Sequence, residues 1–82
     1  MAHFVYLARC ADDSLYCGTC LDLHEREAKH NDGTGAKYTR SRRPVAIVYH
    51  ESFDTLSEAR KREAEVKRWP KAKKEHLLAN VR

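Results

Sequence analysis

Three segments carry the hydrophobic spacing of β-strands. Within residues 3–10, positions 4–8 are all apolar, which is the pattern of a central strand with both faces covered. Turn-forming residues occupy 11–14, and residues 15–19 follow as a second strand, so the first two strands are expected to form a hairpin. A third strand is predicted at 45–52.

Two tyrosines, Tyr6 and Tyr16, fall on the two strands of this hairpin. Side chains alternate between the faces of a strand, so the length of the connecting loop decides whether the two rings share a face. A three-residue loop places them together, whereas a four-residue loop separates them. The sequence alone leaves both arrangements open.

The first predicted helix is weakly apolar. Asp22 is positioned to cap it, and the helix is expected to stop near residue 30, before Gly33. Leu23, Arg26 and His30 lie within an arc of about 60° at helical spacing. The predicted inner face therefore carries an arginine and a histidine beside a single apolar anchor. The segment 34–44 is then expected to be an ordered loop.

A second helix is predicted over 55–69, and Pro70 ends it and begins a last helix through about residue 78. Its apolar stripe contains an acid. Advancing about 100° per residue, the stripe comprises Leu56, Ala59, Glu63 and Val66. A carboxylate facing inward needs a partner, and two remain open: an ion pair with a core-side arginine, or a bound metal ion.

The order of elements is β-β-α-β-α-α, which favours a small mixed sheet covered by helices in a single α/β domain over residues 1–82. The chain has no apolar run long enough to cross a bilayer and no secretory signal pattern, so a cytoplasmic protein with no membrane contact is expected.

Positive charge is concentrated in two blocks of the chain, whose formal net charge is +4. Residues 37–43 contain four bases and no acid, and residues 60–74 contain eight bases against Glu63 and Glu65. Such blocks indicate a polyanionic partner, although a solvated helix face and a soluble loop explain the charge equally well.

The three cysteines suggest two further sites. Cys17 and Cys20 form a CxxC before a helix, the spacing of a thioredoxin-like redox site, but the preceding hairpin opposes a βαβ fold. Cys10 with this pair and a histidine suggests a zinc site, for which a second short-spaced pair is missing. Reduced thiols are therefore expected.

The order and spacing of several motifs resemble the GIY-YIG nuclease superfamily, in particular its small stand-alone single-domain branch. The first motif is Phe4-Val5-Tyr6, with Phe4 in place of the glycine that opens the superfamily's motif, and Cys17 stands for the isoleucine of the second. The remaining matches are Leu15-Tyr16-Cys17-Gly18, Asp22-Leu23, Arg26, His30-Asn31, Gly35-Ala36-Lys37-Tyr38-Thr39-Arg40, Arg42-Arg43-Pro44, Ser57-Glu58-Ala59 and Glu63.

This resemblance implies a three-stranded antiparallel sheet flanked by helices and a metal-dependent phosphodiesterase site. Glu63 would hold one Mg²⁺ or Mn²⁺ ion, and Arg26 would grip the scissile phosphate. Tyr6 would take a proton from the attacking water, with Tyr16 positioning that water or exchanging roles with Tyr6. His30 would contact phosphate or assist the leaving group.

The implied partner is DNA, with no small-molecule cofactor. Backbone contacts are expected from Lys37, Tyr38, Thr39, Arg40, Arg42 and Arg43. The expected activity is endonuclease-like hydrolysis of DNA phosphodiesters with low sequence specificity, on branched, nicked or single-stranded DNA, in repair or recombination. The main alternative is a nucleic-acid-binding module with little or no cleavage, which would use the same basic surface.

Overall fold

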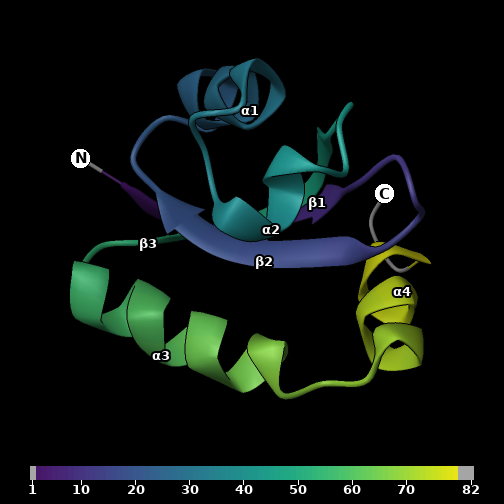
Figure 1. Cartoon of the computed structure of the whole chain (residues 1–82). Coiled ribbons are helices and arrows are strands. Elements are labelled where there is room, and N and C mark those ends of the chain that lie inside the picture. Colours follow the sequence, from purple (N-terminus) through teal and green to yellow (C-terminus); the bar gives the residue numbers. More distant parts are fainter. Residues whose placement is uncertain (1, 80–82) are drawn as a thin grey trace.

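The computed structural model describes residues 2–79, which form one three-stranded sheet with helices on both faces. β1 (His3–Arg9) lies in the centre, between β2 (Leu15–Cys20) and β3 (Ala46–Phe53), and both pairings are antiparallel (Figure 1). The expectation of a mixed sheet is therefore wrong, and the antiparallel sheet that the resemblance implied is confirmed. β2 and β3, which the helices connect, run in the same direction. They do not pair with each other, because β1 lies between them and is antiparallel to both.

The hairpin register places the two tyrosines on one face. Tyr6 pairs with Gly18, and Tyr16 pairs with Ala8, so both rings alternate to the same side of the sheet. The connection over residues 10–14 has an odd number of residues and closes with a hydrogen bond from the Cys10 amide to the Ser14 carbonyl at 2.9 Å. This loop settles the parity that the sequence left open.

The helix α1 (Leu23–Asp32) begins and ends where local chemistry requires. Asp22 caps it by accepting a hydrogen bond from the Glu25 amide at 3.0 Å, and Gly33 ends it with φ of 88°, a left-handed conformation that glycine adopts without strain. A short helix, α2 (Lys37–Arg40), follows in the segment that was expected to be a loop. Four residues with no side-chain cap give too weak a periodic signal to be predicted.

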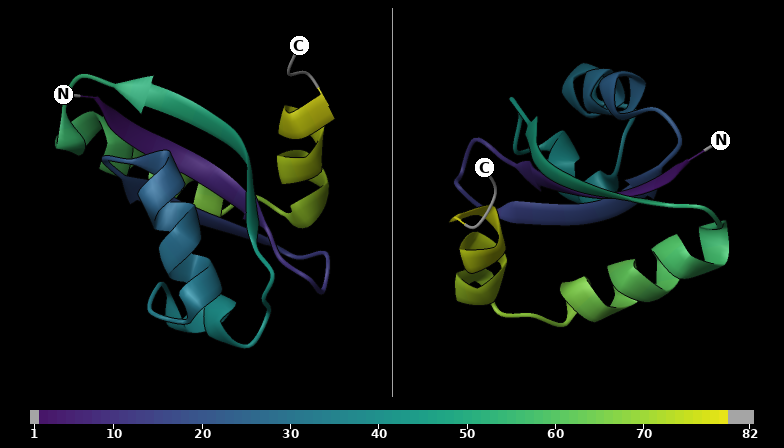
Figure 2. Two further views of the ribbon diagram at one scale, coloured as in Figure 1. Left: turned by 90° about the horizontal axis from the view of Figure 1, so that it is seen from above. Right: turned by 180° about the vertical axis from the view of Figure 1, so that it is seen from behind.

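The remaining helices are α3 (Leu56–Lys67), capped by Thr55, and α4 (Lys71–Ala79), which starts after Pro70 as expected. Figure 2 shows α1 and α2 on one side of the sheet and α3 on the other. Among residues 2–79, no helix has the length and apolar composition needed to span a membrane.

The two faces of the sheet bury different side chains. On the α3 face, β1 and β2 contribute Val5, Leu7 and Cys17, which pack against Ala59 and Val66. The α1 face contains a second cluster, made of Tyr6, Ala8, Cys10 and Val45 with partly buried Tyr16, Cys20, Leu23 and Ile47. The central strand is thus covered on both sides, as its unbroken apolar run predicted.

A polar contact strengthens the weakly apolar packing of α1. The Glu27 carboxylate accepts a hydrogen bond from the Ile47 amide of β3 at 2.7 Å, close to where the register with β1 shifts between Leu7 and Ala8. This hydrogen bond gives a partly buried amide of the edge strand β3 a partner, so Glu27 stabilises the sheet in a way that a hydrophobic side chain at that position could not.

Candidate active site

Tyr6 and Tyr16 lie at the centre of the candidate site, on the α1 face of the hairpin. Their ring centroids are 6.3 Å apart, and the Tyr6 side chain is fully buried. Gly18 makes this packing possible, because a Cβ at that position would lie 2.6 Å from the Tyr6 hydroxyl oxygen and 3.1 Å from the Tyr16 ring. Gly18, in the second motif, is therefore needed because any larger residue would occupy the space of the Tyr6 side chain, in the first motif.

Two residues of α1 bracket the Tyr6 hydroxyl. Arg26 Nε donates to Tyr6 Oη at 3.3 Å, and His30 Nε2 lies 2.7 Å from the same oxygen. His30 has 0% exposure and its Nδ1 lies 2.8 Å from Thr39 Oγ1. The spacing of four residues between Arg26 and His30 places both side chains on the inner face of α1, as the sequence predicted.

The hydrogen-bond directions in this network follow from the partner to which Thr39 donates. Thr39 Oγ1 donates to the Ala36 carbonyl at 3.0 Å, so it accepts from His30 Nδ1. Neutral His30 then carries its proton on Nδ1 and presents the Nε2 lone pair to Tyr6. The result is an ordered series from the Tyr6 hydroxyl through His30 to Thr39.

Burial controls the protonation of this network. Removal from water raises the pKa of Tyr6 to about 12, although the hydrogen bond and charge of Arg26 work in the opposite direction. Burial, followed by the nearby Arg26 charge, lowers the pKa of His30. At neutral pH Tyr6 is therefore a phenol and His30 a neutral imidazole.

Glu63 approaches from the opposite face, at the open edge of β2. Its side chain is 21% exposed, and its carboxylate pairs with Lys67 of the same helix at 3.2 Å. Glu63 also helps to raise the pKa of Cys17 to about 11, after the larger effect of burial. Lys67 Nζ lies 5.9 Å from the centroid of the Tyr16 ring. Because β2 is an edge strand, residues on both faces meet around it.

The expected partner of Glu63 was a core-side arginine or a metal ion, and the arginine pair is not what the structure contains. Arg26 contacts Tyr6 instead, and the carboxylate is paired with Lys67 on the flank of α3. Leu56 is 40% exposed, so the apolar stripe of α3 is narrower than its spacing suggested. A partly exposed carboxylate is thus available to an ion from solvent.

The donor set is compatible with a Mg²⁺ or Mn²⁺ ion that retains much of its own water. In residues 2–79, no group of three His, Cys, Asp or Glu side chains is placed to hold a metal. Glu63 would therefore be the protein ligand, with the other positions filled by water and by phosphate oxygens. Mg²⁺ is commonly bound in this way, through one or two carboxylates together with substrate phosphates.

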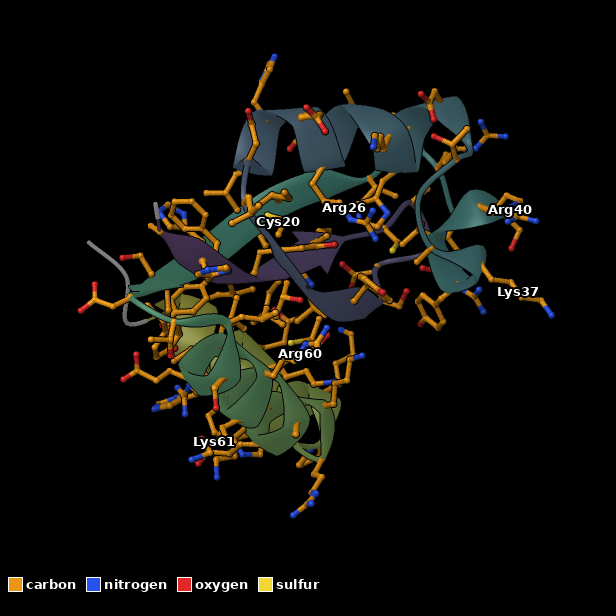
Figure 3. All side chains as sticks on the ribbon, turned by 90° about the vertical axis from the view of Figure 1, so that its left-hand side faces the viewer. Cys20, Arg26, Lys37, Arg40, Arg60 and Lys61 are labelled. Carbon is orange, nitrogen blue, oxygen red and sulfur yellow. The ribbon has the colours of Figure 1, made fainter. Side chains whose placement is uncertain are left out.

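The loop residues expected to bind DNA take different roles. Thr39 is fully buried against His30, so its side chain is part of the support of the site and not of its surface. Lys37 and Arg40 are exposed on α2, as the side view in Figure 3 shows. Tyr38 is exposed and stacks on Tyr16, with ring centroids 5.8 Å apart and an interplanar angle of 25°.

Two further arginines of this loop are held by contacts within the chain. The Arg42 guanidinium lies 4.0 Å from the Tyr38 ring centroid and bonds to Asp12 at 3.0 Å. Arg43 donates to the backbone carbonyls of Arg40 and Asn31 at 2.9 and 3.3 Å. Both side chains therefore order the loop, in addition to any contact that they make with phosphate.

Sequence reasoning missed two bases that flank Glu63. Arg60 and Lys67 lie three residues before and four residues after it, so all three share one flank of α3. Figure 3 shows Arg60 on the side of α3 that faces the sheet and Lys61 on the outer side. The helical spacing of Arg60 and Lys67 from Glu63 was the available signal. The helix contains so many other bases that these two did not stand out.

A shallow surface cleft of about 650 Å³ opens beside Arg26, the residue that contacts the Tyr6 hydroxyl. Its lining includes Arg26 from α1, Thr19 and Cys20 from the end of β2, and Leu56 from α3. Tyr6 itself is covered, so a phosphate group entering from this side meets Arg26 first.

The cysteines form neither of the sites considered from the sequence. Cys17 packs on the α3 face, whereas Cys10 and Cys20 belong to the cluster on the other face. The CxxC lies in a β-strand, and its two thiols point to opposite sides, so a dithiol redox pair is excluded. Burial raises the pKa of Cys17 to about 11 and also raises that of Cys20, which keeps both thiols protonated.

Comparison with known proteins gives consistent matches along the chain. Residues 2–76 match the family model described as the GIY-YIG catalytic domain. The UPF0213 protein SSP2268 of Staphylococcus saprophyticus and the UPF0213 protein of Staphylococcus aureus are each 52% identical over 77 residues, covering 94% of this chain and 94% of the relative.

Two solution structures are also similar to this fold. The UPF0213 protein BH0048 from Bacillus halodurans has a TM-score of 0.62 and 43% identity, and protein EF2693 from E. faecalis has a TM-score of 0.64 and 41% identity. Each similarity covers 96% of this chain and 84% of the other.

Proposed function

The chain belongs to the GIY-YIG family of nuclease domains, and we propose that it hydrolyses DNA phosphodiester bonds with the help of one divalent metal ion. One observation supports this proposal above the others. Arg26 and His30 both contact the Tyr6 hydroxyl, which lies on the same face of the sheet as Tyr16, and Lys67, the ion-pair partner of Glu63, lies 5.9 Å from the centroid of the Tyr16 ring. A proton acceptor, a phosphate-binding cation and a metal-binding carboxylate thus come from three separate elements.

Arg26 is suited to bind the scissile phosphate. Its Nε is used by Tyr6, in a long hydrogen bond of 3.3 Å, and within residues 2–79 no other hydrogen bond or ion pair of its side chain is present. The two terminal nitrogens are therefore available for a bidentate contact with phosphate oxygens. In the transition state, the same guanidinium stabilises the negative charge that develops on those oxygens.

Phosphate binding also uncovers Tyr6. When the Arg26 guanidinium moves toward a phosphate, its weak hydrogen bond with the Tyr6 phenol breaks. This leaves space for a water molecule at Tyr6 Oη. Tyr16, packed between Tyr6 and Tyr38, orients that water toward phosphorus. Its stacking on Tyr38 restricts the ring, which favours a defined position for its hydroxyl.

The proton relay explains how a phenol with a pKa of about 12 acts as the base. Tyr6 Oη takes a proton from the attacking water while its own proton passes to His30 Nε2, so the phenol never has to exist as a free phenolate. His30 becomes an imidazolium. The positive charge of Arg26 disfavours this second cation until a negatively charged phosphate is bound. His30 therefore acts through Tyr6, because its complete burial prevents the direct contact with the phosphate or the leaving group that the resemblance implied.

Glu63 would hold the Mg²⁺ or Mn²⁺ ion at the open edge of β2. Such an ion supplies Lewis-acid stabilisation of the phosphate oxygens and of the leaving oxygen. DNA contacts beyond the scissile phosphate are assigned to Lys37 and Arg40, whose side chains are exposed, and to Tyr38. Contacts of this kind fix the backbone and read no base sequence, which is consistent with low specificity.

A binding module without cleavage is the second candidate. The observation that favours it is the occupied carboxylate: Glu63 is paired with Lys67, and residues 2–79 provide no cluster of three metal ligands. Such a module would bind DNA with the same salt dependence and would form no product.

A cleavage time course separates the two candidates. Single-stranded, nicked and branched DNA are incubated with Mg²⁺ or Mn²⁺ and with the wild type or Glu63→Ala, Arg26→Ala or Tyr6→Phe. We expect product from the wild type and a loss of about 10²-fold or more in each variant. Equal product from all four proteins would indicate a contaminating nuclease, and binding without product would establish the module.

A further inference from the structure

Lys67 lies against both Glu63 and Tyr16, which belong to different elements of the site. Its ammonium lies 3.2 Å from a Glu63 carboxylate oxygen and 5.9 Å from the centre of the Tyr16 ring. The Lys67 side chain is 50% exposed, whereas that of Glu63 is 21% exposed. The lysine therefore approaches the carboxylate from solvent, at the end of a flexible four-carbon chain.

An ammonium and a divalent ion cannot share this carboxylate favourably. The two cations would lie within a few ångströms of each other and repel, and in the described part of the chain Lys67 is the only base that is ion-paired with Glu63. A metal ion that binds Glu63 must therefore displace Lys67. The displaced ammonium remains beside Tyr16, whose ring centroid lies 6.3 Å from that of Tyr6, and Tyr6 is the residue that Arg26 contacts.

We propose that Lys67 is a second phosphate-binding residue of the active site, which Glu63 holds until a phosphate and a metal ion arrive together. Phosphate attracts the ammonium away from the carboxylate, and the freed carboxylate takes the ion. The binding of DNA and of metal is thereby coupled, and the coupling is reciprocal. This inference rests on the proposed function, since it requires Glu63 to be the metal ligand.

Metal binding to the free protein gives the first test. The dissociation constant for Mn²⁺ is measured by electron paramagnetic resonance on the wild type, Lys67→Met, Glu63→Gln and the matched control Lys61→Met, which removes an exposed lysine from the outer side of the same helix. We expect Lys67→Met to bind Mn²⁺ about two- to fivefold more tightly than the wild type, because the competing ion pair is absent. Lys61→Met should match the wild type.

DNA binding gives the second test. In the Tyr6→Phe background, affinity for a phosphorothioate oligothymidylate is measured at several salt concentrations, with and without Mn²⁺. Adding Lys67→Met should lower the salt slope by about 0.7, which corresponds to one phosphate contact on a single strand, and should reduce the tightening that Mn²⁺ produces. Lys61→Met should leave the dependence on Mn²⁺ unchanged.

The outcomes distinguish this inference from the proposed function. If Mn²⁺ binding is lost in Glu63→Gln but Lys67→Met binds Mn²⁺ and DNA as the wild type does, the role of Lys67 is overturned and the metal site remains. If Glu63→Gln binds Mn²⁺ as well as the wild type, or if none of the proteins binds it with or without DNA, both the metal site and the role of Lys67 are overturned.

Discussion

The two faces of one small sheet show two uses of burial. On the α3 face, Val5, Leu7 and Val66 are buried with other apolar groups. On the α1 face, the deepest side chains are Tyr6 and His30, which are fully buried and joined by a hydrogen bond. The α3 face therefore supplies cohesion, while the α1 face holds polar groups at fixed positions in a partly dehydrated setting.

This division depends on complete pairing of the buried polar atoms. In residues 2–79, every buried side-chain nitrogen and oxygen has a hydrogen-bond partner. The network therefore avoids the usual cost of burying polar groups, about 1–3 kcal/mol for each one left unpaired. Mutations on the two faces should accordingly separate stability from chemistry.

Leu7→Ala should produce the largest loss of stability. It removes a side chain that is 1% exposed at the centre of the α3 face, and we expect a decrease of about 2–5 kcal/mol in the free energy of unfolding. Urea unfolding measures this decrease. The cleavage rate per folded molecule, measured at low temperature, should stay close to wild type, and a large fall in that rate would contradict the separation of the two faces.

Gly18→Ala should affect the chemistry more than the core. The added Cβ would lie 2.6 Å from Tyr6 Oη, so the phenol must move away from its contacts with Arg26 and His30. We expect a loss of about 10²-fold in single-turnover cleavage, which corresponds to about 2.7 kcal/mol in the barrier. DNA affinity, measured without metal, should change little. Wild-type cleavage by this variant would mean that the position of Tyr6 does not matter.

The burial of His30 predicts a dependence of stability on pH. Its pKa is lower in the folded protein than in the unfolded chain, so below the unfolded value of about 6.5 the unfolded chain binds more protons. Stability should therefore fall as pH decreases through this range, by up to about 1.4 kcal/mol per pH unit between the two pKa values.

Urea unfolding at pH 7.5 and 5.5 measures this dependence. His30→Gln should reduce the difference between the two pH values, because glutamine does not titrate. An equal difference in both proteins would show that other groups cause the pH dependence.

Lys37→Gln should have the smallest effect. The side chain is exposed on α2, away from the buried network, so stability should be unchanged within about 0.5 kcal/mol. DNA binding should weaken modestly and its salt slope should decrease by about 0.7–0.9 if Lys37 neutralises one phosphate. An unchanged salt slope in binding titrations would remove Lys37 from the DNA-binding surface.

Much of the framework follows from local patterns. The apolar run of β1 predicted a strand covered on both faces, Asp22 was identified as a helix cap, and the spacing of Arg26 and His30 placed both on one helix face. These features depend on neighbours within a few residues, so the sequence contains the relevant physical interactions.

Other features of the site needed contacts between distant segments. Nothing local indicated that Thr39, expected at the DNA surface, would be buried against His30. The pairing of Glu63 with Lys67 did have a local signal in their i, i+4 spacing, but only the tertiary structure showed that Arg26 contacts Tyr6 instead of this carboxylate. The hairpin parity that joins Tyr6 to Tyr16 was likewise undecided until the register was known.

By itself, the sequence determined the types and order of the elements other than α2, together with the residue types available for phosphate chemistry, because periodicity and capping are short-range effects. The tertiary structure decided which of these residues meet. The order β2-β1-β3 leaves β2 at an open edge, where α1 reaches one face and α3 the other. Contacts between these elements are fixed by long-range packing and strand register, which cannot be read from any short segment of the chain.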